Sequence, residues 1–332
     1  MLPFDKTGLS YTKKCVFACG HCIAESSPLT EGKMSFDEAK GYIKSIAKVA
    51  KLVSFTGGEA LIYYDEIIKL VGLAKDLGLE VGIVTSSGWV YDDLSNCEKI
   101  IGLAEAGLSR LVLSWDQYHE QFSGIEKPLA LARAARDLGV DVRIRTVAAA
   151  SGSDRAMMYY EKFKEIASEH EIMNLLKLGR AAGLPDDSFC WTETLPRGYC
   201  SSVGSPVVDV DGTVYACCGP SFYSSKKSPL VLGNAKEEPL ENILNRAKKD
   251  PVLYAIHVIG PYGLHQLLEH HPEFQNFKKR ARYTGTCELC LDITNTPDWT
   301  EPLRERLKDR KTMLVLQAIG LQKKTEKKKQ LP

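Results

Sequence analysis

Apolar and polar positions follow two different rhythms along the first 180 or so residues of the chain. Short apolar runs rich in β-branched residues are each followed by a longer segment in which apolar side chains recur every three to four positions. The first rhythm predicts buried strands, and the second predicts amphipathic helices that cover them. Six strands are expected, at residues 8–12, 52–56, 79–85, 110–114, 140–147 and 172–178.

Helix boundaries are marked by residues with capping chemistry. Ser35 and Glu38 have the spacing of a capping box, which opens a helix that reaches about Ala50. Gly78 and Gly139 are expected to end two later helices, because glycine accepts the left-handed conformation at a helix end. Further helices are predicted over 94–106, 128–138 and 156–168. Strands and helices thus alternate, which predicts an α/β fold, a partial (β/α)6 barrel of the TIM type.

The helical rhythm lapses after Leu184, and a different architecture is expected there. Val207–Val210 and Thr213–Cys217 flank an Asp-Gly pair, the signature of a β-hairpin. A helical stretch follows from about 239 to 282. We therefore predict a barrel over 1–184, a small second domain over 185–300, and a C-terminal helix with a basic tail over 301–332.

Composition narrows the class of protein. The 332 residues carry 43 basic and 42 acidic side chains, a net charge of +1, so no overall field attracts nucleic acid. No apolar run is long enough to span a membrane, and the first residues lack the regions of a signal peptide. We expect a cytoplasmic protein with no nucleic-acid or membrane partner. Its ten cysteines are then more naturally metal ligands or reactive thiols than disulfides.

Three of these cysteines, Cys15, Cys19 and Cys22, follow the first predicted strand with the spacing C-x3-C-x2-C. A four-iron cluster held by three thiolates keeps one iron open for another molecule to chelate. The alternative reading of the loop is a zinc knuckle or scattered core thiols.

The cysteine loop resembles that of the radical S-adenosylmethionine (radical SAM) superfamily. The resemblance implies that SAM chelates the open iron of a 4Fe-4S cluster and is cleaved to a 5'-deoxyadenosyl radical that abstracts hydrogen from a substrate. It also implies that Gly57, Gly58 and Glu59, at the end of the second strand, hold the methionine amino group of SAM. Two glycines permit close backbone approach, and a carboxylate suits an ammonium group.

Other polar residues follow the later strands, where the loops of a barrel form the active site. The resemblance implies that they contact SAM or substrate, although Ser87 stands where related enzymes often carry Asn. The alternatives are a plain turn at the serines, a capped loop with a solvated His119, and buried salt bridges at the arginines. The expected cofactor-binding residues here are Ser86, Ser87, Ser114, Asp116, Arg145 and Arg180.

A second group of cysteines, Cys200, Cys217, Cys287 and Cys290, resembles the twitch form of the SPASM domain, which carries an auxiliary 4Fe-4S cluster. A zinc site with four thiolates fits the spacing too. Consecutive side chains of a strand point to opposite faces, so Cys217 and Cys218 are not expected to bind the same cluster, and one of the pair is a spare thiol. Such a thiol either packs or gives a hydrogen atom to a carbon radical.

These motifs together resemble the radical SAM peptide epimerases that make epipeptides. The resemblance implies that a Cα hydrogen is removed from a ribosomally made precursor peptide and that Cys218 returns hydrogen, which converts an L-residue to a D-residue. An external electron donor such as flavodoxin or ferredoxin is expected. The alternatives are peptide crosslinking through a thioether or a carbon–carbon bond, dehydrogenation of a small substrate, and a zinc-stabilised binding protein without catalysis.

Overall fold

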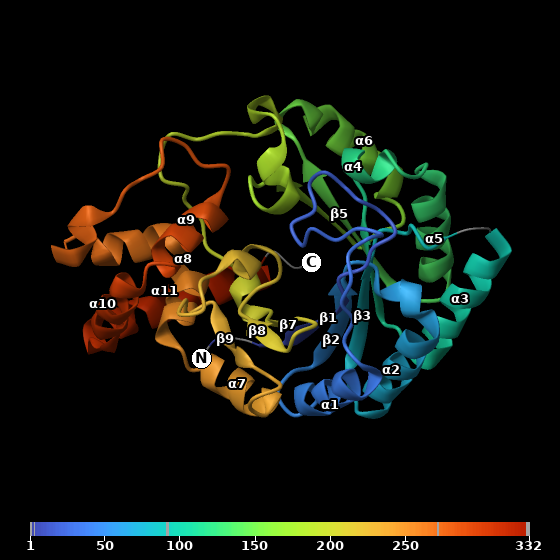
Figure 1. The fold of residues 1–332 in the computed structure, drawn as a ribbon, viewed down its shortest axis with the longest axis horizontal. Helices are drawn as coiled ribbons and strands as arrows, with labels where there is room; N and C mark the ends of the chain where they lie inside the picture. The colour runs from blue at the N-terminus through green and yellow to red at the C-terminus, as the bar shows by residue number, and fades with distance from the viewer. Residues whose placement is uncertain (1, 3, 91–92, 271, 330–332) are drawn as a thin grey trace.

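A single nine-stranded sheet runs through the computed structural model, which describes residues 2, 4–90, 93–270 and 272–329 (Figure 1). The strand order is β6-β5-β4-β3-β2-β1-β7-β8-β9, and the first six strands all pair in parallel. These strands are β1 (Lys6–Thr12), β2 (Leu52–Gly57), β3 (Glu80–Thr85), β4 (Arg110–Ser114), β5 (Asp141–Ala148) and β6 (Glu169–Asn174).

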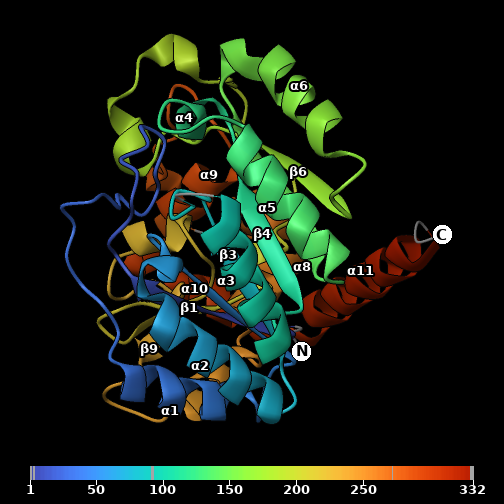
Figure 2. The same ribbon diagram turned by 90° about the vertical axis from the view of Figure 1, so that its right-hand side faces the viewer.

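Helices connect the parallel strands and cover the outer face of the sheet (Figure 2). They are α1 (Phe36–Ile46), α2 (Tyr64–Asp76), α3 (Asp93–Ala106), the short α4 (Gln117–Glu120), α5 (Glu126–Asp137) and α6 (Ser153–Phe163). The capping box at Ser35 and Glu38 is present, and Gly78 and Gly139 both have φ of 79° beyond the ends of α2 and α5. The predicted α/β fold with six parallel strands of a partial barrel is confirmed.

The prediction for the sixth strand was wrong by about three residues. The strand covers Glu169–Asn174, whereas the apolar run that suggested 172–178 continues into the loop after it. Most residues of β6 are exposed, because this strand lies at the edge of the sheet. Its glutamates remain in contact with solvent, so they destabilise the strand little. The apolar periodicity expected of a buried strand is therefore absent from β6.

The inner face of the barrel is polar and charged. Lys6, at the start of β1, lies within electrostatic reach of Arg110 on β4, Arg145 on β5 and Glu171 on β6. Strands at opposite ends of the six-stranded array therefore curl toward each other across the inner face. Buried leucines, isoleucines and valines fill the other face, where the helices pack.

The second region extends the same sheet. Strand β7 (Val207–Val208) pairs with β1, and β8 (Thr213–Tyr215) and β9 (Val231–Asn234) continue outward in antiparallel order. The predicted hairpin is present, with Gly212 at φ 87° in its turn. However, β8 ends at Tyr215, so Cys217 and Cys218 lie in a bend rather than on the strand. The alternation of a strand therefore cannot be the reason that their side chains diverge.

Helices close the second region. They are α7 (Leu240–Ala247), α8 (Pro251–Leu268), α9 (Thr286–Thr294), α10 (Pro297–Lys308) and α11 (Arg310–Lys329). The single helical stretch predicted over 239–282 is thus two helices and a loop. Helix α8 itself is kinked at Gly260, whose φ of 70° precedes Pro261. One apolar core runs from Leu9 in the barrel to Leu289 in α9, and the predicted division into three regions remains a prediction.

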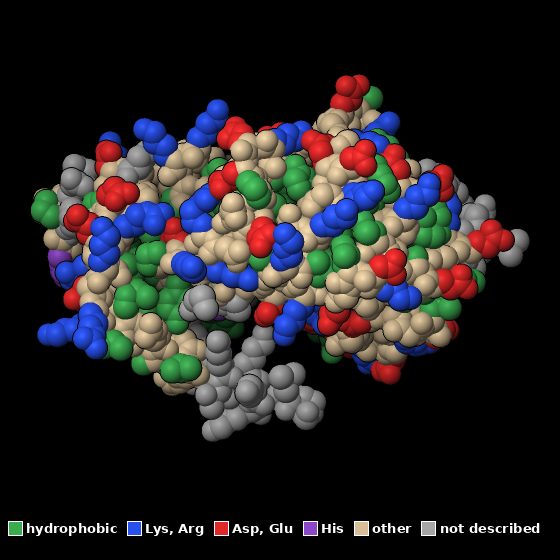
Figure 3. Space-filling model, turned by 90° about the horizontal axis from the view of Figure 1, so that it is seen from below, with side chains coloured by type: hydrophobic (Ala, Val, Ile, Leu, Met, Phe, Trp, Pro, Cys, Tyr) green, Lys and Arg blue, Asp and Glu red, His purple; other side chains and the backbone are tan. Residues whose placement is uncertain are grey.

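Acidic and basic side chains are interspersed on the face shown in Figure 3. This distribution matches the net charge of +1. Of the helices in the described ranges, none has both the length and the apolar composition that a membrane crossing requires.

Candidate functional site

Three cysteine side chains lie together on the loop that follows β1. Cys15 and Cys22 lie close enough to Cys19 that their thiolates would raise its pKa. The backbone N–H of Cys22 donates to the carbonyl oxygen of Cys19 at 3.1 Å. Burial raises the pKa of the Cys15 thiol to about 12. A coordinating metal supplies the positive charge that deprotonates such a thiol. Three clustered thiols of this kind fit an iron–sulfur cluster.

The loop after β2 packs its backbone directly against the cysteine loop. Gly58 N–H donates to the carbonyl oxygen of Thr12 at 2.7 Å, and Glu59 N–H donates to that of Lys14 at 2.8 Å. A Cβ on Gly58 would lie 2.1 Å from the Lys14 oxygen, and one on Gly57 would lie 2.4 Å from the Thr12 oxygen. Both glycines are thus required by the close approach of two backbones, which fixes the start of the cysteine loop.

The Glu59 side chain points to the end of β3. Its Oε2 accepts hydrogen bonds from the Thr85 hydroxyl at 2.8 Å, from Ser86 N–H at 3.0 Å and from the Ser86 hydroxyl at 2.9 Å. The side chain is fully buried, and burial raises its pKa. The predicted residues Glu59 and Ser86 therefore lie together, at the edge shared by β2 and β3.

Ser87 adopts the left-handed conformation, with φ of 63°. Among non-glycine residues, asparagine, aspartate and histidine are enriched in this region, so a serine here is unusual. The Ser87 hydroxyl is buried, and no described residue bonds to it. A buried hydroxyl without a partner is costly, so it points to a ligand that would satisfy it.

Asp116 lies between two histidines at the end of β4. Its Oδ1 is 2.9 Å from Nδ1 of His119, and its Oδ2 is 3.2 Å from Nε2 of His21 on the cysteine loop. Its oxygens also accept from the backbone N–H groups of Tyr118 and Val147 at 3.0 and 3.3 Å. Burial opposes ionisation, but the flanking histidines hold the pKa of Asp116 well below its usual range. Asp116 thus fastens the loop after β4 to the cysteine loop.

The two predicted arginines differ in their surroundings. Arg145 faces the inside of the barrel, where its Nε donates to Glu171 at 3.0 Å, and Ser114 is its register partner on β4. Arg180 instead holds the cysteine loop. Its Nη1 donates to the carbonyl oxygen of Cys19 at 2.7 Å, and its Nη2 donates to that of Ser26 at 2.8 Å. A contact of either arginine with SAM remains a prediction.

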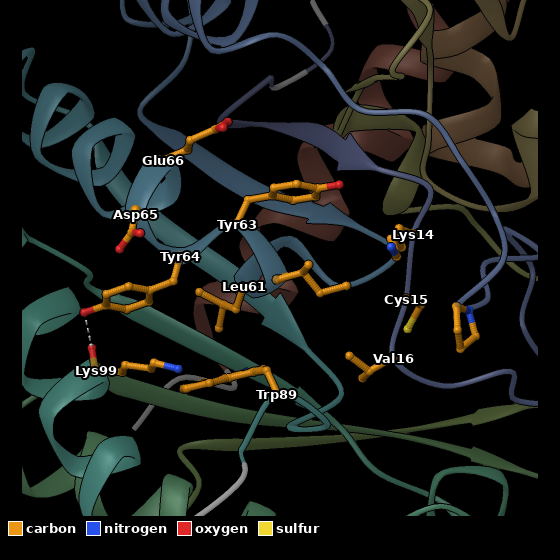
Figure 4. A pocket seen from close by; sticks show the side chains of 12 residues that line it. Lys14, Cys15, Val16, Leu61, Tyr63, Tyr64, Asp65, Glu66, Trp89 and Lys99 are labelled. Atoms are coloured by element: carbon orange, nitrogen blue, oxygen red, sulfur yellow. Dashed lines mark hydrogen bonds between the residues drawn. The ribbon is translucent and has the colours of Figure 1, made fainter.

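A cavity of about 610 Å³ opens on the outer side of the cysteine loop (Figure 4). Cys15 and Val16 line one part of it, and Trp89, Tyr64 and Lys99 line another, with the Tyr64 hydroxyl donating to the Lys99 carbonyl oxygen. Cys15 is thus a lining residue of this cavity.

The second predicted set of thiols also gathers in space. Cys200, Cys287 and Cys217 all lie close enough to Cys290 to affect its ionisation, and burial raises the pKa of Cys290 well above its usual value. Burial raises the pKa of Cys287 to about 12. Four such thiols fit a metal centre for the reason given for Cys15.

Cys218 lies beside this set but differs from it in exposure. Cys217 is buried, whereas Cys218 is exposed to solvent. Cys218 also acts electrostatically on Lys6 of the inner barrel face. The thiol therefore lies next to the second set and within reach of the barrel interior. Cys190 is exposed, and the side chain of Cys97 lies outside the described residues.

Three residues that belong to this arrangement were not predicted as site residues: His21, Lys6 and Glu171. The position of His21 inside the C-x3-C-x2-C motif was a usable signal. The sequence around Lys6 and Glu171 carries no such signal, because only the curl of the sheet brings β1 and β6 close to each other.

Comparison with known proteins identifies the family. The sequence profile of the Radical SAM superfamily matches residues 9–195, and that of SPASM, an iron-sulfur cluster-binding domain, matches residues 200–252. The chain is 19% identical over 309 residues to the protein named "Putative peptide biosynthesis protein YydG" of Bacillus subtilis (strain 168), which covers 89% of this chain and 94% of that protein.

Two solved structures share the fold. SuiB of Streptococcus suis bound to precursor peptide SuiA has a TM-score of 0.58 at 13% identity and covers 87% of this chain and 76% of its own. Native anSMEcpe with bound AdoMet has a TM-score of 0.54 at 16% identity and covers 95% of this chain and 100% of its own. The cofactors are therefore a 4Fe-4S cluster, SAM and an auxiliary iron–sulfur cluster. The chain belongs to the Radical SAM superfamily, and a SPASM iron–sulfur domain follows its barrel.

Proposed function

We propose that the chain is a radical SAM epimerase, which converts an L-residue of a ribosomally made peptide to its D-form. The observation that carries this proposal is the exposed Cys218, which lies beside the second thiol set and close enough to Lys6 to affect its ionisation. A thiol in that place can meet a substrate in the barrel, whereas its neighbour Cys217 is buried. The named likeness to a peptide biosynthesis protein supports a peptide substrate.

When bound, SAM and its cluster supply the radical that removes the Cα hydrogen. The S–H bond of Cys218 then breaks, its hydrogen forms the new C–H bond on the opposite face, and a sulfur radical remains. One electron and one proton return this sulfur to the thiol. The electron comes from an external single-electron donor such as flavodoxin or ferredoxin, so no oxidant is consumed and the peptide keeps its mass.

Inversion requires that hydrogen is removed from one face and returned to the other. Lys6 begins β1, and the loop with Cys15 follows the end of the same strand. Gly219, the residue after Cys218, packs against Ile23, the residue after Cys22, so the proposed donor lies near the cysteine loop. Delivery of hydrogen to the opposite face of the substrate is part of the proposal.

Several residues of the barrel would hold SAM. The hydroxyl of Ser87, buried and unsatisfied by any described residue, would bond to the ribose or the carboxylate of SAM. The Glu59 carboxylate would receive the methionine ammonium group. The remaining proposed contacts are Gly57, Gly58, Ser86, Ser114, Asp116, Arg145 and Arg180.

The test uses synthetic candidate precursor peptides, in an anaerobic reaction in deuterated water. The enzyme should release 5'-deoxyadenosine and form a D-residue that carries one deuterium. Cys218→Ala should still cleave SAM but form no D-residue, whereas the matched control Cys190→Ala, at another exposed cysteine, should behave as the parent does. If Cys218→Ala still forms a deuterated D-residue, Cys218 is not the donor. A product two hydrogens lighter would instead support crosslinking or dehydrogenation.

A further inference from the structure

One edge of the barrel sheet is open. Strand β6 (Glu169–Asn174) pairs with β5 on one side and ends the sheet on the other (Figure 2). Five of its six residues are exposed, and only His170 is partly covered. The other end of the sheet is the four-residue β9 of the SPASM region.

The register of β6 shows which backbone groups face the open side. Met173 is paired with Val147, and Leu175 N–H donates to the carbonyl oxygen of Ala148 at 3.0 Å. Backbone direction alternates along a strand, so Glu171 and Met173 face β5. Ile172 and Asn174 therefore turn their N–H and C=O groups outward, where no strand of the described ranges pairs with them.

Two usual protections of an edge strand, a proline and a bulge, are missing from β6. Natural edges carry outward charges, a proline or a bulge that prevent another chain from pairing. The β6 sequence EHEIMN has no proline, and its six pairs with β5 are in continuous register. The two glutamates of β6 are neutralised by ion pairs, Glu169 with Arg143 and Glu171 with Arg145. Ile172 and Met173 are 41% and 36% exposed.

The open edge borders the space in which the chemistry would occur. Glu171 on β6 and Cys218 both act electrostatically on Lys6. A strand added to β6 would present alternate side chains to this same interior, because side chains of a strand alternate between its faces.

We propose that the free edge of β6 docks the substrate, and that an extended segment of the peptide pairs with it as an added strand. This inference rests on the proposed peptide substrate and specifies how that peptide is held. Main-chain hydrogen bonds supply affinity in this mode of recognition, and alternate side chains supply specificity. It explains how one edge can bind a peptide through its backbone whatever its sequence.

The experiment measures backbone hydrogen exchange at single residues. The probe is a twelve-residue peptide selected from a displayed random library on the anaerobic, SAM-loaded holoenzyme. In the free enzyme, the amides of Ile172 and Asn174 should exchange fast, while those of Glu171 and Met173 should exchange slowly. The peptide should slow the first pair and leave the second unchanged. Slowing confined to other segments, or a library without binders, would overturn the inference.

A pair of variants separates the backbone from the side chain. Ile172→Pro removes the outward N–H, and Ile172→Ala removes a similar part of the side chain but keeps that N–H. Proline is tolerated at an edge when its N–H side faces solvent. Ile172→Pro should weaken peptide binding at least tenfold more than Ile172→Ala, with equal release of 5'-deoxyadenosine in the absence of peptide. Equal affinities would contradict edge pairing.

Two other outcomes are distinct. Protection of the edge that rises with protein concentration, together with a dimer in sedimentation, would assign the edge to a second copy of the chain and overturn the inference. A peptide that pairs with β6 but is never epimerised would overturn the proposed function while leaving the docking site intact.

Discussion

The guanidinium of Arg180 donates to the carbonyl oxygen of Cys19 at 2.7 Å, between residues 161 positions apart in the sequence. Its second terminal nitrogen bonds to Ser26, and its backbone N–H bonds to Cys22. The segment after β6 thereby holds the loop that starts from β1. The cysteine loop contains no helix or strand, so its shape depends on such contacts from distant parts of the chain.

Arg180→Lys should loosen the cysteine loop, because an ammonium group cannot reproduce the two-pronged contact. The loss of a hydrogen bond from a charged donor costs about 1.5–3 kcal/mol in the free energy of unfolding. Iron content after anaerobic reconstitution should fall as well. Arg133→Lys, at an exposed arginine on α5, is the matched control and should change neither quantity. Full iron content in Arg180→Lys would refute the positioning role.

Gly58→Ala should displace the start of the cysteine loop, since its Cβ would lie 2.1 Å from the Lys14 carbonyl oxygen. Overpacking of this kind typically costs about 1–3 kcal/mol. Gly72→Ala is the control, because its Cβ on α2 would meet no atom within 4 Å. That helix substitution should stabilise the protein by about 0.5–1 kcal/mol. Thermal unfolding and iron content measure both variants, and a neutral Gly58→Ala would contradict the packing argument.

The ion pair between Glu38 and Lys236 should make stability depend on pH. Hydrogen bonds from Lys236 and Ser35 lower the pKa of Glu38 from 4.5 to about 2. A carboxyl group with a lowered pKa stabilises the fold above its unfolded value, and this contribution is lost as pH falls toward the folded value. Urea unfolding from about pH 6 down to about pH 3 should therefore show a smaller loss of stability in Glu38→Gln than in the parent. The control Glu31→Gln, at an exposed carboxylate, should retain the parental slope.

Replacement of both Cys287 and Cys290 by Ser should remove the auxiliary cluster and leave the first one. Two of its four thiolates would be lost, so about half of the iron should disappear from the reconstituted protein. The visible absorbance should fall in proportion, while Cys190→Ser, at an exposed thiol, should keep all of the iron. Unchanged iron in the double variant would show that these thiols do not hold the auxiliary cluster.

The sequence predicted most of what depends on local patterns. The six strands, the capping box at Ser35 and the gathering of Cys200 with Cys287 and Cys290 all follow from periodicity, capping chemistry and thiol spacing. The errors lie where long-range structure overrides a local pattern. Strand β6 is placed by its pairing with β5 and by its position at an edge, so its own composition is misleading.

Roles that depend on spatial neighbours could not be predicted. The expected contact of Asp116 with a ligand stays a prediction, whereas its bonds to histidines from different loops and to backbone donors had no signal in the local sequence. The pairing of Arg180 with the cysteine loop has no counterpart in the local sequence either. Both depend on the order of the strands in the sheet, which brings distant loops to one end of the barrel.

The pairing of β7 with β1 constrains how the molecule can admit a large substrate. Gly8 N–H donates to the carbonyl oxygen of Pro206 at 2.8 Å, and Gly8 packs against Val207 so closely that no side chain would fit. A hinge between the barrel and the SPASM region would have to tear this seam in the middle of the sheet. Entry of a chain from the opposite flank, past β6, would break no backbone pairing of the resting enzyme.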